Sequence, residues 1–127
     1  MKINQIKAIK ATLNIVCGKW KAPILLVLVE KELRFSEIKN SLPKINHQTL
    51  IKQLKQLEKD GLISRTSYQE VPPRVEYRLT EYGAELEELL NDMMTWGEKH
   101  LEMNNTILEE DEVIYDRHEL DGEMSHQ

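Results

Sequence analysis

The fold is decided by residues 43–63, which read PKINHQTLIKQLKQLEKDGLI. Pro43 ends any helix that precedes it, because its ring blocks continuation of the helical hydrogen-bond pattern. Asn46 is a strong N-cap residue, and the helical pattern that follows it runs to about Lys59. Gly61 suits the left-handed position just after a helix end. The stretch therefore predicts a tight turn that leads into one well-bounded helix.

The residues before this stretch predict three further helices. Apolar residues at spacings of three and four indicate an amphipathic helix over 3–17. Residues 24–29 are apolar on almost every side, which predicts a second helix that is buried. Ser36 is expected to cap a third helix over 37–42. Two short helices separated by a tight turn are typical of a helix-turn-helix.

The residues after the stretch predict a hairpin and a long helix. Alternating apolar and polar residues indicate strands over 62–68 and 75–80, and paired prolines place a turn at 69–74. Thr80 is expected to cap a helix that runs to about Met103. The predicted fold class is therefore mainly α (α+β), a winged helix-turn-helix whose two-stranded hairpin is the wing.

The helix over 47–59 has one apolar face and one polar face. Leu50, Leu54 and Leu57 fall within roughly 60° of one another at about 100° per residue. The opposite face carries amides and ammonium groups and no carboxylate; its residues are Gln48, Lys52, Lys55, Gln56 and Lys59. Such side chains hydrogen-bond base edges and phosphates, so we expect this helix to enter the major groove of DNA. Gln48, Thr49 and Lys52 lie near its N-terminus and are the expected base readers.

The charge is distributed unevenly along the chain. Residues 1–83 hold 15 Lys or Arg against 8 Asp or Glu, a balance of +7, whereas residues 84–127 hold 2 against 14, a balance of −12. The basic part favours a nucleic-acid partner. We expect Lys39 and Lys55 to contact phosphates and Arg74 to enter a minor groove from the hairpin tip. The full set of predicted DNA contacts is Ser36, Lys39, His47, Gln48, Thr49, Lys52, Gln53, Lys55 and Arg74.

Four stretches form a recognisable set: GKW at 18–20, RFSEI at 34–38, LEKDGLI at 57–63 and PPRVEYRLTEYG at 72–83. With this set the chain resembles the HxlR family of bacterial winged helix-turn-helix transcriptional regulators. The resemblance covers about residues 10–103. It implies a homodimer that binds a palindromic operator in double-stranded DNA.

Two apolar stripes predict how such a dimer forms. A domain of this size has little interior in which to bury both stripes, so we expect them to pack across a two-fold axis. The predicted interface residues are Ile6, Ile9, Leu13, Val16, Leu86, Leu89, Met93 and Trp96. The alternative is that both stripes close the core of a single chain. The domain is expected to span residues 1–103, followed by an acidic tail over 104–127 in which residues 107–115 favour a final short helix.

Cys17 is the only cysteine, which suits a reducing cytoplasm. Some members of the HxlR family sense oxidants through a cysteine ahead of the first helix, but Cys17 stands at the end of that helix. We therefore interpret it as a small core residue, with redox sensing as the alternative. The longest apolar run, 22–29, is too short to span a bilayer, and no secretory leader is recognisable at the start.

Other classes of function find little support in the sequence. It contains no glycine-rich phosphate loop and no cluster of metal ligands, so we expect no enzyme, metal or cofactor. One alternative is a winged-helix module that binds a protein and does not bind DNA specifically. A second is that a small-molecule effector, whose identity is open, binds the regulator in a pocket near Trp20, Met93, Met94 and Trp96.

Overall fold

The computed structural model describes residues 2–104, 108–109 and 112–113. The chain separates into two units, Met1–Asn91 and Asp92–Gln127, and each is considered by itself. The first unit contains α1 (Ile3–Val16), α2 (Lys21–Val27), α3 (Phe35–Ser41), α4 (His47–Lys59), β1 (Ile63–Tyr68), β2 (Arg74–Leu79) and α5 (Glu81–Ala84). The helix α6 (Glu87–Met103) begins in the first unit and continues into the second, and β3 (Leu108–Glu109) and β4 (Glu112–Val113) follow it.

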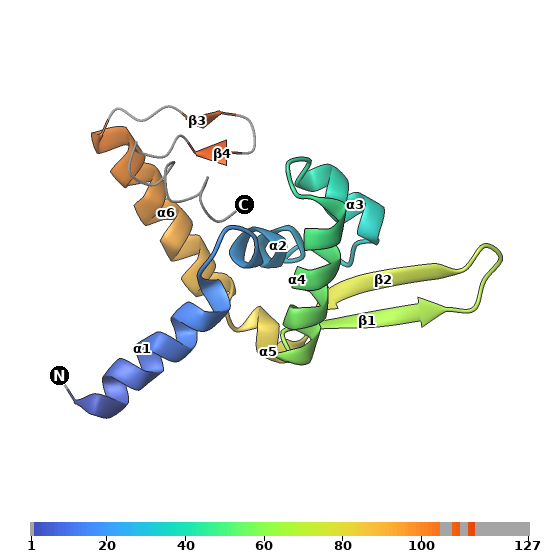
Figure 1. Ribbon diagram of the computed structural model, residues 1–127, viewed down its shortest axis with the longest axis horizontal. Helices are drawn as coiled ribbons and strands as arrows, with labels where there is room; N and C mark the ends of the chain where they lie inside the picture. Colours follow the sequence, from blue (N-terminus) through green and yellow to red (C-terminus); the bar gives the residue numbers. More distant parts are fainter. Residues whose placement is uncertain (1, 105–107, 110–111, 114–127) are drawn as a thin grey trace. The chain divides into compact units, whose positions relative to one another are not determined.

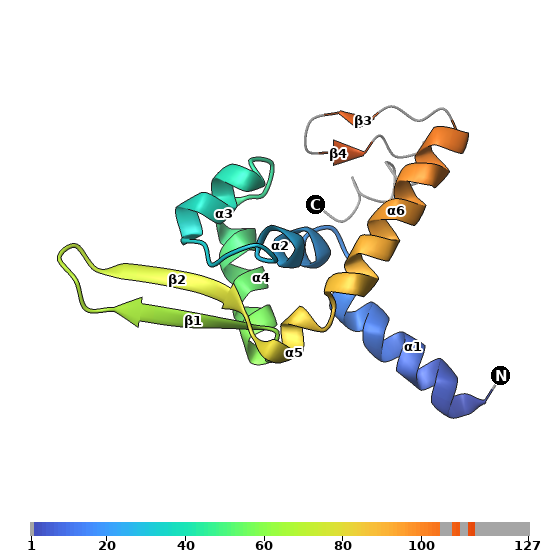
Figure 2. The ribbon, with the colours of Figure 1, turned by 180° about the vertical axis from the view of Figure 1, so that it is seen from behind.

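The hydrophobic core lies where α2, α3 and α4 meet the base of the hairpin (Figures 1 and 2). Its fully buried side chains are aliphatic, and they come from each of these elements and from the turn between α3 and α4: Ile24, Leu25, Ile38, Ile45, Leu50, Leu54, Leu57 and Ile63. No polar or charged residue of the described chain is buried. Burial of aliphatic surface is therefore what stabilises this unit.

Both ends of α4 are closed by local hydrogen bonds. At the start, Asn46 Oδ1 accepts hydrogen bonds from the backbone N–H groups of Gln48 at 2.8 Å and Thr49 at 3.2 Å. At the end, the N–H of Leu62 donates to the carbonyl of Leu57 at 3.0 Å, and Gly61 adopts φ +78°. This arrangement is a Schellman motif. The predicted boundaries of α4 and the winged helix-turn-helix architecture are confirmed.

The hairpin β1–β2 is antiparallel, with a register that runs from Ile63↔Leu79 at its base to Tyr68↔Arg74 near its tip. Leu33 adds a short bridge to Tyr77, so the segment before α3 extends the sheet by one residue. The wing is thereby joined at its base to the three-helix core.

Several predicted boundaries differ from the structure. α3 begins at Phe35, and its first turn is closed by the Glu37 carboxylate, which accepts a hydrogen bond from the Arg34 N–H at 2.8 Å. Ser36 therefore lies inside the helix and does not cap it. The helix expected over 24–29 runs from Lys21 to Val27.

The helix expected from Thr80 to Met103 is divided. Thr80 caps it as predicted, since its Oγ1 accepts a hydrogen bond from the Gly83 N–H at 3.0 Å. The chain then tightens through i→i−3 bonds from Glu85 to Tyr82 and from Leu86 to Gly83, and α6 starts afresh at Glu87. The prediction of a final short helix over 107–115 is wrong for the residues that the structure describes there, because Leu108 and Val113 pair as antiparallel strands.

Among the described residues, no helix combines the length and apolarity required to cross a bilayer.

An added methyl group is expected to have opposite effects on stability at Gly83 and at Gly97. A Cβ at Gly83 would collide with the backbone carbonyl of Leu62, whereas a Cβ at Gly97 would meet no atom within 4 Å. We expect Gly83→Ala to lower the free energy of unfolding by about 2 kcal/mol or more. The matched Gly97→Ala should raise it by roughly 0.5–1 kcal/mol, because alanine favours a helix interior. Urea denaturation measures both, and a Gly83→Ala variant as stable as the wild type would contradict this packing.

Candidate nucleic-acid interface

The polar face of α4 is exposed to solvent. Leu50, Leu54 and Leu57 are buried on the opposite side, which fixes the rotation of the helix about its axis. The side chains left outside are His47, Gln48, Lys52, Lys55, Gln56, Glu58 and Lys59. Within the part of the chain that the structure describes, Lys52 and Lys55 make no ion pair. Their ammonium groups are therefore available to an anionic partner.

Two of the predicted contacts on α4 are only partly exposed. Thr49 and Gln53 are half-buried, and the Gln53 Oε1 atom is buried without a hydrogen-bond donor among the described residues. A buried carbonyl without a donor is costly, so Gln53 is constrained by the protein interior more than Gln48 or Gln56. Gln56 was not in the predicted set, although its exposure follows from the same helical periodicity.

Three further predicted contacts lie on α3 and at the start of α4. The His47 ring lies edge-on to the Phe35 ring, with centroids 4.9 Å apart. Lys39 is half-buried, and its ammonium donates a hydrogen bond to the carbonyl of Pro43 at 3.1 Å. Ser36 is exposed on α3. His47 and Ser36 thus remain open to solvent, whereas Lys39 is engaged by the turn itself.

Arg74 does not project from the tip of the wing. It is half-buried at the start of β2, and its guanidinium pairs with the carboxylates of Glu70 and Glu76. The tip instead exposes Val71 and the two prolines that follow it.

The predicted dimer residues divide into exposed and buried groups. On α1, Ile6, Ile9 and Leu13 are 40–51% exposed, and on α6 the exposed members are Leu89, Met93 and Trp96. Val16 belongs to the hydrophobic core, and Leu86 is partly buried and packs against that core. These two residues therefore stabilise the single chain. Ile3 and Met103, outside the predicted set, are more exposed than any of the eight.

Cys17 is exposed, which corrects its interpretation as a core residue. It follows the last residue of α1, and its N–H donates to the carbonyl of Leu13 at 2.7 Å. The pattern of apolar residues placed it in the helix, but the helix ends one residue earlier, and the chain turns away at Gly18 with φ +95°.

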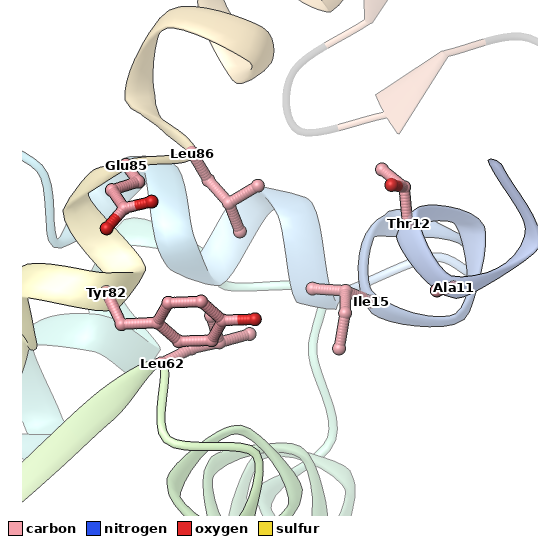
Figure 3. Close-up of a pocket in the computed structure, with 7 residues that line it drawn as sticks. All are labelled: Ala11, Thr12, Ile15, Leu62, Tyr82, Glu85 and Leu86. Carbon is pink, nitrogen blue, oxygen red and sulfur yellow. The ribbon is translucent and has the colours of Figure 1, made fainter. Parts of the chain in front are cut away.

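A pocket of about 260 Å³ lies between α1 and α5, with Leu62 at its base (Figure 3). None of the four residues predicted for an effector pocket lines it; the lining residues are Ala11, Thr12, Ile15, Leu62, Tyr82, Glu85 and Leu86. The described residues also include no cluster of His, Cys, Asp or Glu that could hold a metal ion.

Comparison with known proteins gives a consistent result. The family model for the HxlR-like helix-turn-helix matches residues 15–105. The chain is 45% identical over 94 residues to the uncharacterized HTH-type transcriptional regulator YtcD of Bacillus subtilis, covering 74% of this chain and 75% of that protein. It is 46% identical over 92 residues to YdeP of the same organism, covering 72% of each. The solved structure of the redox regulator HypR in its reduced form matches with a TM-score of 0.73 at 37% identity, over 77% of this chain and 97% of that one.

Asn46 holds the first turn of α4, which carries Gln48 and Thr49. We expect Asn46→Ala to lower the free energy of unfolding by about 1 kcal/mol, because two backbone N–H groups lose their acceptor. Asn46→Asp keeps an acceptor oxygen and should retain wild-type stability in urea denaturation. Equal stability of the alanine and aspartate variants would show that the cap contributes nothing.

Proposed function

The chain belongs to the HxlR-like helix-turn-helix family of DNA-binding transcriptional regulators, and we propose that it acts as a homodimer on a palindromic operator. In this proposal α4 enters the major groove and the β1–β2 wing lies along the adjacent minor groove. We also propose that the protein acts in the cytoplasm of a bacterial cell, where it would meet DNA.

The exposed face of α4 is the observation that carries the proposal. It presents two amides, at Gln48 and Gln56, and the ammonium groups of Lys52 and Lys55, which have no ion-pair partner among the described residues, on a helix whose other face is fixed in the core. A glutamine amide can bond adenine through two hydrogen bonds, and a lysine can reach guanine or a phosphate. The rigid support matters because base readout requires donors and acceptors to be held in register with the base edges.

The exposed apolar residues of α1 and α6 support a dimer. Ile3, Ile9 and Leu13 are each about half exposed or more, as are Trp96 and Met103. Large apolar side chains that are exposed on a helix favour an interaction site there, because their contact with water is unfavourable. A two-fold dimer would present two copies of α4 to half-sites separated by about 34 Å, one turn of DNA.

Selection from a pool of random duplexes tests the proposal directly. We expect enrichment of a palindrome, with an affinity that falls steeply as the salt concentration rises. A pool that remains unenriched even at low salt would overturn specific DNA binding and favour a winged-helix module that binds a protein.

Lys52 and Lys55 form a matched pair on the exposed face of α4. We expect Lys52→Ala to reduce affinity for the selected operator by roughly tenfold or more, with a smaller loss on random DNA, because a base contact is lost. Lys55→Ala should reduce affinity for both equally and lower the salt slope by about one, as loss of a phosphate contact does. Fluorescence anisotropy over a salt series measures both. Equal losses on both DNAs for Lys52→Ala would assign it to phosphate.

Ile9 tests the dimer. A carboxylate in an apolar interface is strongly unfavourable, so we expect Ile9→Asp to produce a monomer in light scattering and to weaken operator binding. Asn14→Asp introduces the same charge at an exposed position of the same helix and should leave the dimer intact. If the Ile9→Asp variant remains a dimer, α1 is not part of the dimer interface.

A further inference from the structure

The wing contains a cluster that we call the wing clasp, formed by Tyr68, Glu70, Arg74 and Glu76. We infer that Arg74 is a positioning residue that holds the shape of the wing through this clasp and that it does not contact DNA. The inference rests on the proposed function, since it concerns how the wing meets the minor groove. It replaces the expectation that Arg74 enters that groove.

The guanidinium of Arg74 is engaged on three sides. Nη2 pairs with Glu70 Oε2 at 2.7 Å, and Nη1 donates to Glu76 Oε2 at 3.2 Å. The guanidinium carbon lies 4.1 Å from the centroid of the Tyr68 ring, within the range of a cation–π interaction. Arg74 therefore has a carboxylate at each terminal nitrogen and an aromatic face alongside.

The partners of Arg74 come from different parts of the wing. Tyr68 is the last residue of β1 and pairs with Arg74 in the strand register, Glu70 lies in the connecting loop, and Glu76 belongs to β2. One side chain thus links both strands to the loop. A lysine could not replace it, because only the planar fork of arginine bonds two carboxylates while stacking on a ring.

The clasp is partly buried: the Glu70 side chain is 50% exposed, but its other two charged members are more covered. The side chains of Arg74 and Glu76 are 30% and 15% exposed, and the Arg74 Nε atom is buried with no acceptor among the described residues. To reach a phosphate, Arg74 would have to leave both carboxylates and the ring. The two carboxylates would then stand uncompensated beside the DNA backbone, which repels them.

The clasp leaves an uncharged apex. With Arg74 withdrawn, the exposed residues at the turn are Val71, Pro72 and Pro73. Small apolar residues and prolines can pack against the sugars and bases that line a minor groove. Because no ammonium or guanidinium projects from residues 71–73, we expect this apex to contribute shape and to release no counterion.

A double-mutant cycle on operator DNA tests the inference. We expect Arg74→Ala and Glu76→Ala each to weaken binding roughly three- to tenfold, and the double variant to weaken it no further, because either change opens the clasp. The salt slope should stay at its wild-type value in all three variants. Glu85→Ala removes the same charge outside the wing and should leave the affinity unchanged or slightly higher. Arg74→Lys should bind as weakly as Arg74→Ala.

Changes of DNA affinity in the opposite direction would show that Arg74 contacts DNA. Removal of a carboxylate beside a phosphate-binding arginine strengthens binding, so a gain of affinity in Glu76→Ala would overturn the inference. The same holds if Arg74→Lys keeps wild-type affinity, or if Arg74→Ala lowers the salt slope by about one.

Hydrogen exchange without DNA separates this inference from the proposed function. The Glu70 N–H donates to the Tyr68 carbonyl at 3.0 Å within the loop that the clasp restrains. We expect its exchange to accelerate in Arg74→Ala and Glu76→Ala and to be unchanged in Glu85→Ala. Unchanged exchange in all three variants overturns the clasp, whereas a wild-type protein that binds no duplex overturns the proposed function instead.

Discussion

The backbone at Leu62 is the constraint on which the DNA-binding unit depends. Its N–H donates to the Leu57 carbonyl at the end of α4, and its carbonyl accepts the N–H of Thr80 at 3.1 Å, just after β2. Thr80 in turn donates its hydroxyl proton to the Gly61 carbonyl at 2.6 Å and caps α5. Gly83 then lies directly against the Leu62 carbonyl, where only a hydrogen atom fits. The helix α4, the wing and the chain that leads to α6 are therefore aligned by one short segment of backbone.

Much of this architecture could be predicted because its signals are local. Asn46, Gly61 and the alternation of residues 75–80 each specify their own surroundings, and α4 and the hairpin lie where these signals place them. The division of the last helix was not predictable in the same way. The break occurs where Gly83 packs against the backbone of Leu62. These two residues are distant in the sequence and meet only in the folded chain, so the pattern of apolar residues does not reveal their contact. The prediction that Ser36 caps α3 is wrong for a similar reason. The first turn is closed by Glu37, whose carboxylate accepts a hydrogen bond from the Arg34 N–H, and Glu37 lies inside the helix and not before it.

The candidate site shows the same division between local and tertiary information. The exposed face of α4 follows from helical periodicity once Leu50, Leu54 and Leu57 are assigned to the core, and these three residues are buried. The environment of Arg74 depends on the register of two strands and on the path of the loop between them. Sequence alone shows an arginine at a hairpin tip, and such an arginine suggests a groove contact. The structure places two carboxylates and a tyrosine ring against it before any DNA is present.

These features suggest that charge and shape are assigned to different elements. Residues 1–83 carry a balance of +7, but the pairing of Arg74 with two glutamates leaves the wing clasp with more negative than positive charge. In the proposed complex, the attraction to phosphate would come from exposed cations outside the clasp, such as Lys52 and Lys55 on α4 and Arg65 and Arg78 on the hairpin strands. A rigid wing with an uncharged apex at residues 71–73 has a different use, since it loses little conformational entropy on binding and is sensitive to the width of the minor groove. In the proposed complex, specificity would combine base readout by α4 with groove shape read by the apex of the wing, and the clasp would keep Arg74 out of the salt-dependent contacts.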